Sequence, residues 1–395
     1  MRFLALLPLV FALHGATLTP ERKQSNLNSF EYVWTTIRDK HWDKSLDGAE
    51  WKAVHDELQP KMDQAESMEA ARRVLNEMIG RLHLTHFGVL PGDVYSELHG
   101  GAEGMDVRII NGRAILVRGK HQGWEVEGVQ EAIAKVEKLY EHSTMRELMV
   151  SRAVAAWAGA HEVTLSNGHG ERVTPELSEF AQHGEPTTFG NLPTQYVWSE
   201  SRHIGNAGYF AFNMFFDPGR LIPALAASVG ECGKCTGFVI DLRGNPGGIG
   251  AMAMGMAGFF IQQQGELLGT MQMRDNALKF AINPRVPAFT QKLAVLVDGL
   301  SASTSEIFAG GLQDLKRARV FGSPTAGAAL PSVIERLPNG DAFQYAIANY
   351  VSQSGAVLEG KGVKPDVEVR PNRASLLAGK DDVLESALQW IKRPL

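Results

Sequence analysis

The sequence predicts an α/β fold in three parts: an N-terminal helical part, a middle α+β part and a C-terminal α/β core. In the core, two short apolar runs of strand type, residues 236–242 and 293–297, each lead through a glycine-containing turn into a helix-like segment. Near the N-terminus, residues 68–82 repeat apolar side chains at helical spacing. A length of 395 residues is typical of two to three domains.

The composition indicates a soluble globular protein, because 44% of the residues are hydrophobic and 21% are charged. The formal net charge is −5, and the sequence holds no cluster of lysine and arginine. We therefore expect no nucleic-acid partner. No internal repeat or low-complexity tract interrupts the chain, and nothing in the sequence indicates an oligomeric state.

The N-terminus has the pattern of a secretory signal peptide over residues 1–16. Arg2 precedes an apolar stretch at 3–13, and the small residues Gly15 and Ala16 follow it. The stretch is too short to span a membrane, and no other segment approaches that length, so no integral span is expected. This predicts an exported protein, periplasmic or extracellular, with cleavage near Ala16; an uncleaved anchor is the alternative.

Residues 20–95 are expected to form the N-terminal helical domain, in which Trp34, Trp42 and Trp51 supply aromatic anchors. Its last helix-like segment leads into two histidines, His83 and His86. A metal-binding pair is one interpretation, but no carboxylate or cysteine cluster lies nearby in the sequence, so no metal is predicted. A histidine beside an apolar helix is also compatible with a structural role.

Residues 96–178 should form the middle part, with strand-like runs at 105–110, 114–118 and 162–166 and helix-like stretches at 129–140 and 144–158. Further on, Cys232 and Cys235 are the two cysteines of the chain, and they stand before a strand. A structural disulfide fits an exported protein, whereas a redox-active pair should open a helix after a strand.

The first turn of the core follows residues 236–242 and leads into the helix-like segment 249–262. Its Gly247-Gly248 pair lacks side chains, so the backbone can approach a bound group closely. A phosphate-binding loop is the competing interpretation, but the turn lacks a Gly-Lys-Ser/Thr ending and dinucleotide glycine spacing. Ligands usually bind at the carboxyl ends of such strands.

The second turn places Ser303 where the strand 293–297 gives way to a helix at 303–312. A serine there lies beside backbone N–H groups that have no partner within the helix and could stabilise an oxyanion. Ser303 followed by Glu306 is also a capping box, a purely structural helix start. Beyond it, Pro338-Asn339-Gly340-Asp341 predicts a hairpin between strands at 333–337 and 342–350.

Four motifs from about Tyr209 to the C-terminus resemble, in order and spacing, those of the tail-specific (C-terminal processing) serine proteases. They are DLRGNPGG, SASTSEIFAGGLQD, VFGSPTAGA and EGKGVKPDVEV. The resemblance implies a crotonase-like (ClpP-like) protease core over residues 195–395. It implies Ser303 as the nucleophile, and an oxyanion hole formed by Gly247 or Gly248 together with Thr304, the residue after the nucleophile.

The chain departs from the best-known bacterial members of the family at the general base. Those members use a lysine that follows the Pro-Thr dipeptide, and the corresponding position here is Ala328. Alanine cannot accept a proton, so a Ser-Lys dyad is excluded and another base must serve Ser303 in a hydrolase.

The segment around His86 is similar to that of the tricorn-core branch, in which a histidine after a small hydroxyl residue supplies the base. The match is Thr85-His86, although Phe87 stands where the branch commonly has threonine. Glu359 occupies the position of the branch's glutamate and would orient the imidazole, with Asp366 as the rival carboxylate. Glu306 also matches a family position, as does Asp314, and either could shape the site or simply serve as a cap and a surface charge.

The sequence therefore predicts an exported serine peptidase with a Ser303-His86-Glu359 triad, supported by Thr85, that acts on peptide or protein substrates and needs no cofactor. Family members often carry a PDZ-like domain where residues 96–178 lie, and residues 101–107 vaguely resemble its entry to the first binding strand. A PDZ-like or irregular insert is expected there. The alternative function is a non-catalytic ligand- or peptide-binding protein on the same scaffold, since the resemblance extends to retinoid-binding relatives.

Overall fold

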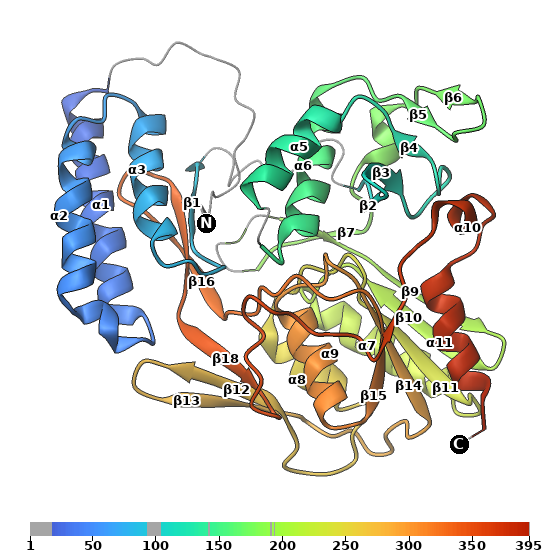
Figure 1. Ribbon diagram of the computed structural model, residues 1–395. Helices are drawn as coiled ribbons and strands as arrows, with labels where there is room; N and C mark the ends of the chain where they lie inside the picture. The colour runs from blue at the N-terminus through green and yellow to red at the C-terminus, as the bar shows by residue number, and fades with distance from the viewer. Residues whose placement is uncertain (1–17, 93–103, 141–142, 190–191, 193, 395) are drawn as a thin grey trace. The chain divides into compact units, whose positions relative to one another are not determined.

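The computed structural model describes residues 18–92, 104–140, 143–189, 192 and 194–394. They fall into two compact units (Figure 1). The first unit combines the N-terminal helices with residues 271–278 and 330–350, and the second holds the remaining chain from residue 99 onward. The expected signal peptide, residues 1–16, lies outside the described residues.

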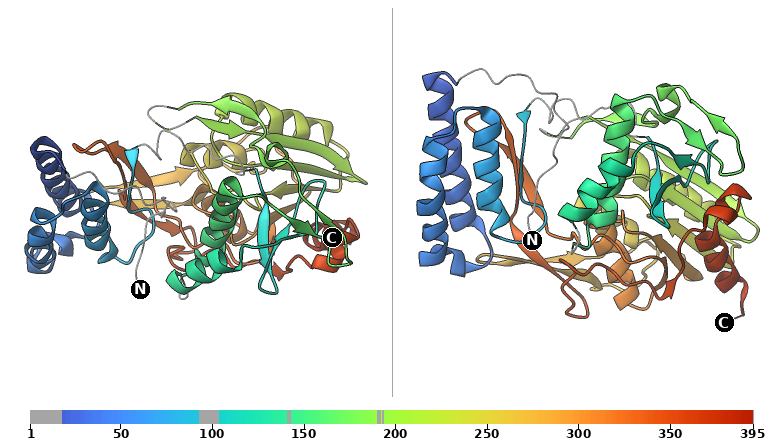
Figure 2. Two further views of the ribbon diagram at one scale, coloured as in Figure 1. Left: turned by 90° about the horizontal axis from the view of Figure 1, so that it is seen from above. Right: turned by 45° about the horizontal axis from the view of Figure 1, so that its top comes forward.

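Three helices that lie side by side make up most of the first unit (Figure 2). The Thr19 hydroxyl accepts a hydrogen bond from the N–H of Arg22 at the start of the first helix, and Ser67 caps the third. The Trp34 and Trp51 indoles each donate to the other's backbone carbonyl, which ties the first helix to the second. The helices are α1 (Pro20–Lys40), the 3-10 helix η1 (Lys44–Asp47), α2 (Ala49–Asp63) and α3 (Met68–Gly80).

A three-stranded sheet, in the order β1-β17-β16, completes the first unit. Its strands are β1 (Gly88–Leu90), β16 (Ser332–Arg336) and β17 (Ala342–Ala346). β1 runs antiparallel to β17, and the buried Asp341 pairs with Arg72 of α3 at 2.8 Å. The expected hairpin is confirmed, but its second strand ends at Ala346, because the chain continues as β18 (Ala348–Ser352), which belongs to another sheet.

The second unit is built on a six-stranded sheet in the order β19-β15-β14-β11-β10-β9. All neighbours are parallel except β9, which lies antiparallel at one edge. Helices α7, α8 and α9 lie on one face and α11 on the other (Figure 1), so the central strands are buried on both faces and read as continuous apolar runs. The elements are β9 (Ser199–Ile204), β10 (Ala207–Phe212), α7 (Pro218–Glu231), β11 (Gly237–Asp241), α8 (Gly250–Ala257), β14 (Lys292–Val297), α9 (Thr304–Asp314), β15 (Ala318–Gly322), β19 (Val367–Glu368) and α11 (Asp382–Lys392).

The helix expected at residues 249–262 is shorter than predicted. α8 ends at Ala257 because Gly258 packs against the backbone of Asn283, where a Cβ would lie 1.8 Å from the carbonyl oxygen. The Arg285 N–H donates to the Gly258 carbonyl, so the chain leaves the helix at this glycine.

The middle part of the chain forms a five-stranded antiparallel sheet, in the order β2-β3-β4-β5-β6, with two helices. It has its own apolar cluster, which includes Val107, Val126, Val154 and Leu165. The elements are β2 (Val107–Ile110), β3 (Arg113–Leu116), β4 (Glu125–Val126), α5 (Gln130–Leu139), α6 (Arg146–Ala160), β5 (Leu165–Ser166) and β6 (Arg172–Val173).

Shorter elements complete the fold, and Cys232 and Cys235 form a disulfide between the end of α7 and the start of β11. A second three-stranded sheet has the order β13-β12-β18, and β7 pairs with β8. The elements are η2 (Leu177–Phe180), β7 (Glu185–Thr187), β8 (Gln195–Val197), β12 (Leu267–Met273), β13 (Ala277–Ala281), β18 (Ala348–Ser352) and α10 (Arg373–Leu377).

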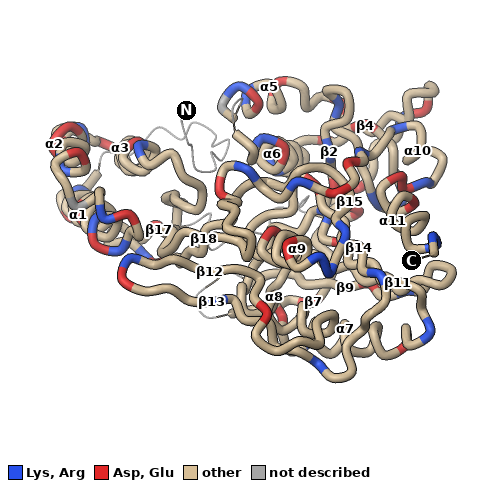
Figure 3. The backbone as a smooth tube through the Cα atoms, turned by 60° about the horizontal axis from the view of Figure 1, so that its bottom comes forward, with Lys and Arg blue, Asp and Glu red and all other residues tan. Residues whose placement is uncertain are grey.

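Acidic and basic residues are interspersed along the backbone (Figure 3). A search of the described helices finds none with the length and apolarity needed to cross a bilayer.

Candidate active site

Two strand-to-helix turns meet at one edge of the six-stranded sheet. β11 and β14 are parallel neighbours, with Asp241 opposite Leu296, so the turns that follow them lie side by side. The two turns are joined directly, because the Ala302 N–H donates to the Asn245 carbonyl at 3.1 Å. This edge is where ligands usually bind in parallel sheets, and it holds both turns singled out from the sequence.

Ser303 stands at the start of α9 in a strained backbone conformation, with φ 54° and ψ −118°. A non-glycine residue with positive φ is uncommon and persists only where its surroundings hold it. Here the Ser303 N–H donates to the Ala328 carbonyl at 2.8 Å and to a Glu306 carboxylate oxygen at 3.0 Å. The carbonyl of Ser303 accepts from the Glu306 N–H at 2.9 Å. A serine on a strained strand-to-helix turn is the arrangement that exposes a nucleophilic hydroxyl.

The neighbouring serines of the same motif have structural roles. Ser301 and Ser305 are fully buried, whereas Ser303 is half-buried. The Ser301 hydroxyl donates to the Leu242 carbonyl at 2.7 Å, and the Ser305 hydroxyl contacts Asn245 at 2.9 Å. Burial and fixed partners make both unsuited to attack a substrate, so the geometry supports Ser303 as the candidate nucleophile.

The glycine pair lies against the candidate nucleophile. Gly247 has φ 95° and Gly248 φ 137°, values that L side chains rarely adopt. A Cβ on Gly247 would lie 2.8 Å from the Cβ of Ser303, and the Thr304 hydroxyl donates to the Gly248 carbonyl at 2.8 Å. Both glycines therefore bring bare backbone to the start of α9.

The two glycines differ in what their N–H groups do. The Gly247 N–H donates to the Asn245 side-chain oxygen at 2.9 Å and is already used. Within the residues that the structure describes, the N–H groups of Gly248 and Thr304 donate to no other protein group. Of the alternatives from the sequence, the hydrogen bonding therefore favours Gly248 over Gly247 as a candidate oxyanion donor, beside Thr304.

Glu306 is a fully buried carboxyl group beneath the candidate nucleophile. One oxygen accepts from the Thr325 hydroxyl at 2.6 Å and the Gly327 N–H at 2.8 Å, and the other from Ser303 and from the Ala328 N–H at 2.9 Å. Burial raises the pKa of Glu306 to about 7, although these four donors act in the opposite direction. Glu306 therefore does more than cap α9, since it joins the nucleophile turn to the segment after β15.

From the sequence, Glu306 could either shape the site or simply cap the helix. The helix itself nevertheless indicates a larger role for Glu306. This residue is acidic, yet it lies in a stretch from Thr304 to Leu312 whose residues are all buried. A charge in so apolar a helix needs several hydrogen-bond partners, and it therefore marks a structured site.

Glu359, the expected third member of the triad, lies beside the same segment as Ser303. Its carboxylate accepts from the Ala329 N–H at 3.3 Å, while Ser303 is bound to Ala328. The rival Asp366 is exposed and accepts from the Val320 N–H at 2.7 Å, which fixes it to β15. This contact gives Asp366 a structural role and favours Glu359 among the two carboxylates.

Ala328, where the lysine of other members would stand, is buried in an apolar cluster. Its partners are Leu148, Leu300, Ala302 and Ala326, with Met145 packed against them. A lysine at this position would bring a charge into apolar surroundings, which is unfavourable without a partner.

His86 belongs to the first unit and follows α3, whereas Ser303 and Glu359 belong to the second. It has φ 57° and is half-buried, and its Nδ1 lies 2.8 Å from the hydroxyl of the buried Thr85. His83 is exposed. Among the described residues, one group of three potential metal ligands comes together, His203 with Cys232 and Cys235, and these two cysteines are joined by a disulfide.

The fold and the two turns define a class of protein, and comparisons with known proteins agree with it. Residues 206–369 match the model of Peptidase family S41, and residues 22–80 match that of the Tricorn protease C1 domain. The chain therefore carries a peptidase family S41 domain over residues 206–369 and a tricorn C1 domain over residues 22–80. The resemblance to the tail-specific proteases and their tricorn-like branch is confirmed.

The most similar relatives include two probable CtpA-like serine proteases. That of Staphylococcus epidermidis is 33% identical over 133 residues, which are 33% of this chain and 27% of the relative. That of Staphylococcus haemolyticus is 30% identical over 173 residues, 43% of this chain and 34% of the relative. The matches thus span about a third of the length of these relatives.

Solved structures show the same fold at low sequence identity. The photosystem II D1 C-terminal processing protease has a TM-score of 0.55 at 17% identity, over 90% of this chain and 94% of that chain. Mature CPAF has a TM-score of 0.63 at 15% identity, over 94% and 97%. The tricorn protease has a TM-score of 0.52 at 13% identity, over 94% of this chain and 37% of its own. The expected protease core fold is therefore confirmed.

Proposed function

We propose that the protein is a serine-type peptidase that hydrolyses peptide bonds through Ser303. The observation that carries this proposal is the strained, half-buried Ser303 beside the N–H groups of Gly248 and Thr304. A nucleophile next to unused backbone donors is what acyl transfer needs, because the attacked carbonyl oxygen becomes an oxyanion. The S41 domain supports the same reaction class.

In this mechanism the Ser303 hydroxyl attacks the peptide carbonyl carbon while His86 removes its proton. The resulting oxyanion is bound by Gly248 and Thr304, and His86 then donates the proton to the leaving amine. A water molecule, activated by His86 in the same way, hydrolyses the acyl-enzyme and regenerates Ser303.

Thr85 gives the imidazole a defined tautomer in this proposal. If the Nδ1 proton of His86 is donated to the Thr85 hydroxyl, 2.8 Å away, Nε2 is left unprotonated to act as base. Glu359 is proposed as the carboxylate that orients the ring. The role of Glu359 is to favour the imidazolium that forms during attack.

The residue at position 328 supports a histidine rather than a lysine base, because alanine has no group that can accept a proton from Ser303. We further propose that the substrate is a peptide or protein and that the chain is exported, the second point resting on the N-terminal pattern of residues 1–16. The parts 20–95, 96–178 and 195–395 are proposed as helical domain, insert and catalytic core.

Covalent labelling of the folded protein with a serine-directed phosphonate, followed by mass mapping, tests the nucleophile. We expect the adduct on Ser303. Labelling of Ser301 or Ser305 would overturn the choice of nucleophile, and folded protein that takes up no label would favour the non-catalytic binding protein.

The base is tested with His86→Ala, which should lower hydrolysis of an unstructured peptide by at least about a hundredfold, the usual contribution of a general base. His83→Ala is the matched control, because His83 is exposed and three residues away. Greater sensitivity at His83 than at His86 would show that the assignment of the base is wrong.

Ala328→Lys distinguishes the two kinds of base. A peptidase that uses His86 should work no faster with the added lysine, since a nearby cation disfavours the imidazolium. An inactive wild type together with an active Ala328→Lys variant would mean that this chain is a degenerate Ser-Lys enzyme, and the triad would be abandoned.

A further inference from the structure

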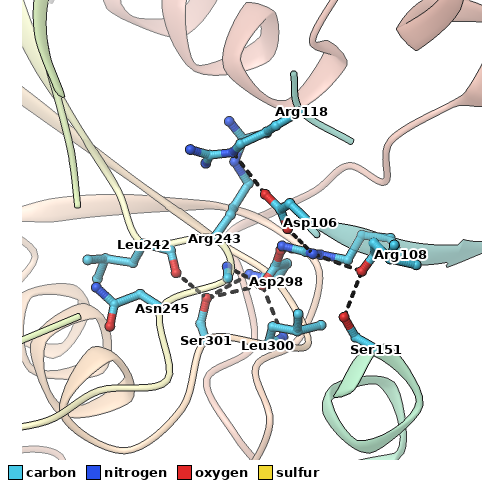
Figure 4. A network of polar contacts seen from close by, with 12 residues as sticks. Asp106, Arg108, Arg118, Ser151, Leu242, Arg243, Asn245, Asp298, Leu300 and Ser301 are labelled. Carbon is cyan, nitrogen blue, oxygen red and sulfur yellow. Dashed lines mark hydrogen bonds and ion pairs between the residues drawn. The ribbon is translucent and has the colours of Figure 1, made fainter. Parts of the chain in front are cut away.

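Arg108 is a buried arginine of the middle part that binds the nucleophile turn of the core. It comes from β2, is 3% exposed, and donates through Nε and Nη2 to one carboxylate oxygen of Asp298 at 2.7 and 2.6 Å (Figure 4). Its third nitrogen, Nη1, donates to Asp106 and to the Val107 carbonyl. Burial lowers the pKa of Arg108, but Asp106 and Asp298 outweigh this effect and raise it above the usual range, so the guanidinium stays charged.

Asp298 is the first residue after β14, and its carboxylate binds backbone N–H groups of both turns at the sheet edge. Its second carboxylate oxygen accepts from the Gly244 N–H at 3.0 Å and from the Leu300 N–H at 3.0 Å. Gly244 belongs to the glycine turn and Leu300 to the nucleophile turn. The orientation of this one carboxylate therefore affects both the donor Gly248 and the nucleophile Ser303.

Ser301 continues the same network toward the site. The Asp298 N–H donates to the Ser301 hydroxyl at 3.0 Å, and that hydroxyl donates to the Leu242 carbonyl (Figure 4). Ser301 is two residues before Ser303. The Ser301 hydroxyl also lies 3.4 Å from the Asp298 carboxylate oxygen Oδ1, so a change in the orientation of that carboxylate reaches the chain two residues before the candidate nucleophile.

The middle part makes a second contact with the nucleophile turn through the start of α6. Glu147 packs on Gly299, where a Cβ would lie 2.2 Å from its carboxylate, and Leu148 packs on Leu300. Ser151 of α6 donates to the Val107 carbonyl at 3.0 Å, which joins the helix to the strand of Arg108. The turn from Asp298 to Leu300 is therefore enclosed by β2 and α6.

We propose that Arg108 is a positioning residue for the reaction, holding the Asp298 carboxylate so that the nucleophile turn and the glycine turn keep their catalytic geometry. The proposal rests on the assignment of Ser303 as nucleophile. It makes the middle part a component of the catalytic support, in addition to any role in binding substrate. Arg108 touches neither substrate nor reacting atoms, so its loss should lower the rate of the chemical step and leave substrate affinity nearly unchanged.

Asp298 would not be released altogether when Arg108 is removed, because its bonds to Gly244 and Leu300 remain. We therefore expect the turns to shift by up to about 1 Å and the fold to persist. A misplacement of about 1 Å is enough to reduce an enzymatic rate by about a hundredfold.

The experiment compares Arg108→Gln, Arg108→Lys and the control Arg113→Gln in the full chain. Arg113 is in the adjacent strand, where it pairs with Glu125 and its side chain is 57% exposed. The measurements are the rate of phosphonate labelling at Ser303, kcat and KM on an unstructured peptide, and the unfolding temperature. We expect Arg108→Gln to lower the labelling rate and kcat by about 10- to 100-fold with KM changed less than about twofold. Arg113→Gln should leave all of these as in the wild type.

Arg108→Lys keeps the charge but loses the planar arrangement of donors, so it should recover part of the lost rate. Combining Arg108→Gln with Asp298→Asn should cost little more than either change alone, since both break one interaction. Folded Arg108→Gln that is labelled at the wild-type rate would overturn the proposal, and so would losses that multiply in the double variant. If Arg108→Gln does not fold, a wild-type labelling rate in Arg108→Lys is the result that overturns it.

Failure of the two proposals can be told apart in the same experiment. If the folded wild type takes up no label, the assignment of Ser303 fails and the positioning role of Arg108 fails with it. If the wild type is labelled and Arg108→Gln reacts equally fast, the role of Arg108 alone is wrong.

Discussion

The turn after β11 and the turn after β14 lie side by side, and both contain residues with positive φ angles. They differ in the residue types at those positions. The first places glycines at its positive φ angles, at Gly244, Gly247 and Gly248. The second places Ser303 at φ 54°, and the Ser303 N–H donates hydrogen bonds to the Glu306 carboxylate and to the Ala328 carbonyl. A turn that must carry a side chain cannot use glycine, so its strain is offset by a buried carboxylate.

An aspartate also stands at the carboxyl end of each of these two strands, and the two aspartates bind different partners. Asp241, at the end of β11, is fully buried and accepts from Arg243 at 2.6 Å, Arg118 at 3.2 Å and Tyr209 at 2.8 Å. Asp298, after β14, binds Arg108 and the N–H groups of both turns. The first aspartate thus balances charge within the fold, whereas the second arranges backbone, and variants at the two turns should separate stability from activity.

The largest effect is expected for Gly247→Ala. Its Cβ would lie 2.7 Å from the Ala302 carbonyl oxygen and 2.8 Å from the Ser303 Cβ, which forces the glycine turn away from the nucleophile. Displacing an oxyanion donor costs on the order of a thousandfold in kcat. The measurement is peptide hydrolysis by protein shown to be folded.

Gly265→Ala is the control for backbone strain alone. Gly265 has φ 84° with no atom near its missing Cβ, so alanine there adds strain of about 1 kcal/mol or more without a clash. Activity as low in Gly265→Ala as in Gly247→Ala would mean that general destabilisation, and not the contact with Ser303, explains the loss.

Asp241→Asn should show the second largest effect, on stability. Burial raises the pKa of Asp241, but Arg243 and Arg118 outweigh it and hold the pKa well below the usual range, so the group is ionised in the folded protein. Asparagine would remove the buried charge that two half-buried arginines share, leaving Arg118 with Asp106 and Arg243 with Asp381, and we expect a loss of about 3 kcal/mol in the free energy of unfolding.

Denaturant unfolding of Asp241→Asn and of the control Asp39→Asn provides the comparison. Asp39 pairs with Arg38 at the surface, its side chain being 58% exposed, and its removal should cost less than about 1 kcal/mol. Equal losses at both positions would mean that the buried charge of Asp241 contributes no more to stability than a surface ion pair does.

The sequence predicted the two turns well, because their features are local. Apolar strands, the glycine pair and the helix that starts beyond Ser303 all lie within short segments, and each of those elements is found close to its expected bounds. The choice between Gly247 and Gly248 required the structure, since it depends on the Asn245 side chain that accepts from Gly247.

Contacts between distant segments could not be predicted in the same way. Arg108 and Asp298 are 190 residues apart, and nothing in the strand of Arg108 distinguishes it from an exposed arginine. Residues 330–350 fold with the N-terminal helices because Arg72 pairs with Asp341 and β1 pairs with β17, partners that local periodicity does not reveal. The role of Glu306 similarly depends on Thr325 and the backbone at 327–328.

The third effect in order of size is a pH dependence of the free energy of unfolding. It arises from Glu306, which binds the nucleophile turn. The pKa of Glu306 is raised from 4.5 to about 7 in the folded protein, so the folded state binds more protons than the unfolded state between these values. Stability should therefore fall as pH rises from about 4.5 to 7, by about 2 to 3 kcal/mol.

Glu306→Gln isolates this dependence, because glutamine does not titrate. Burial lowers the pKa of His41 to about 4, which acts in the opposite sense over the same pH range, so the difference between wild type and variant is the quantity to measure. Urea unfolding at pH 5 and pH 7 gives that difference. A difference that stays constant with pH would show that Glu306 is ionised throughout, as its four donors alone would favour.

The smallest effect is expected for Ser301→Ala, which tests whether the serines of one motif have separate roles. The variant loses the bond to the Leu242 carbonyl and leaves the Asp298 N–H without its acceptor, so the free energy of unfolding should fall by about 1 to 2 kcal/mol. Asp298 keeps Arg108, Gly244 and Leu300, and phosphonate labelling of Ser303 should therefore slow by less than about tenfold. Ser303→Ala should show the reverse, with unfolding nearly unchanged and labelling abolished. Loss of labelling in folded Ser301→Ala, together with persistent labelling in Ser303→Ala, would exchange the two roles and move the nucleophile to the buried serine.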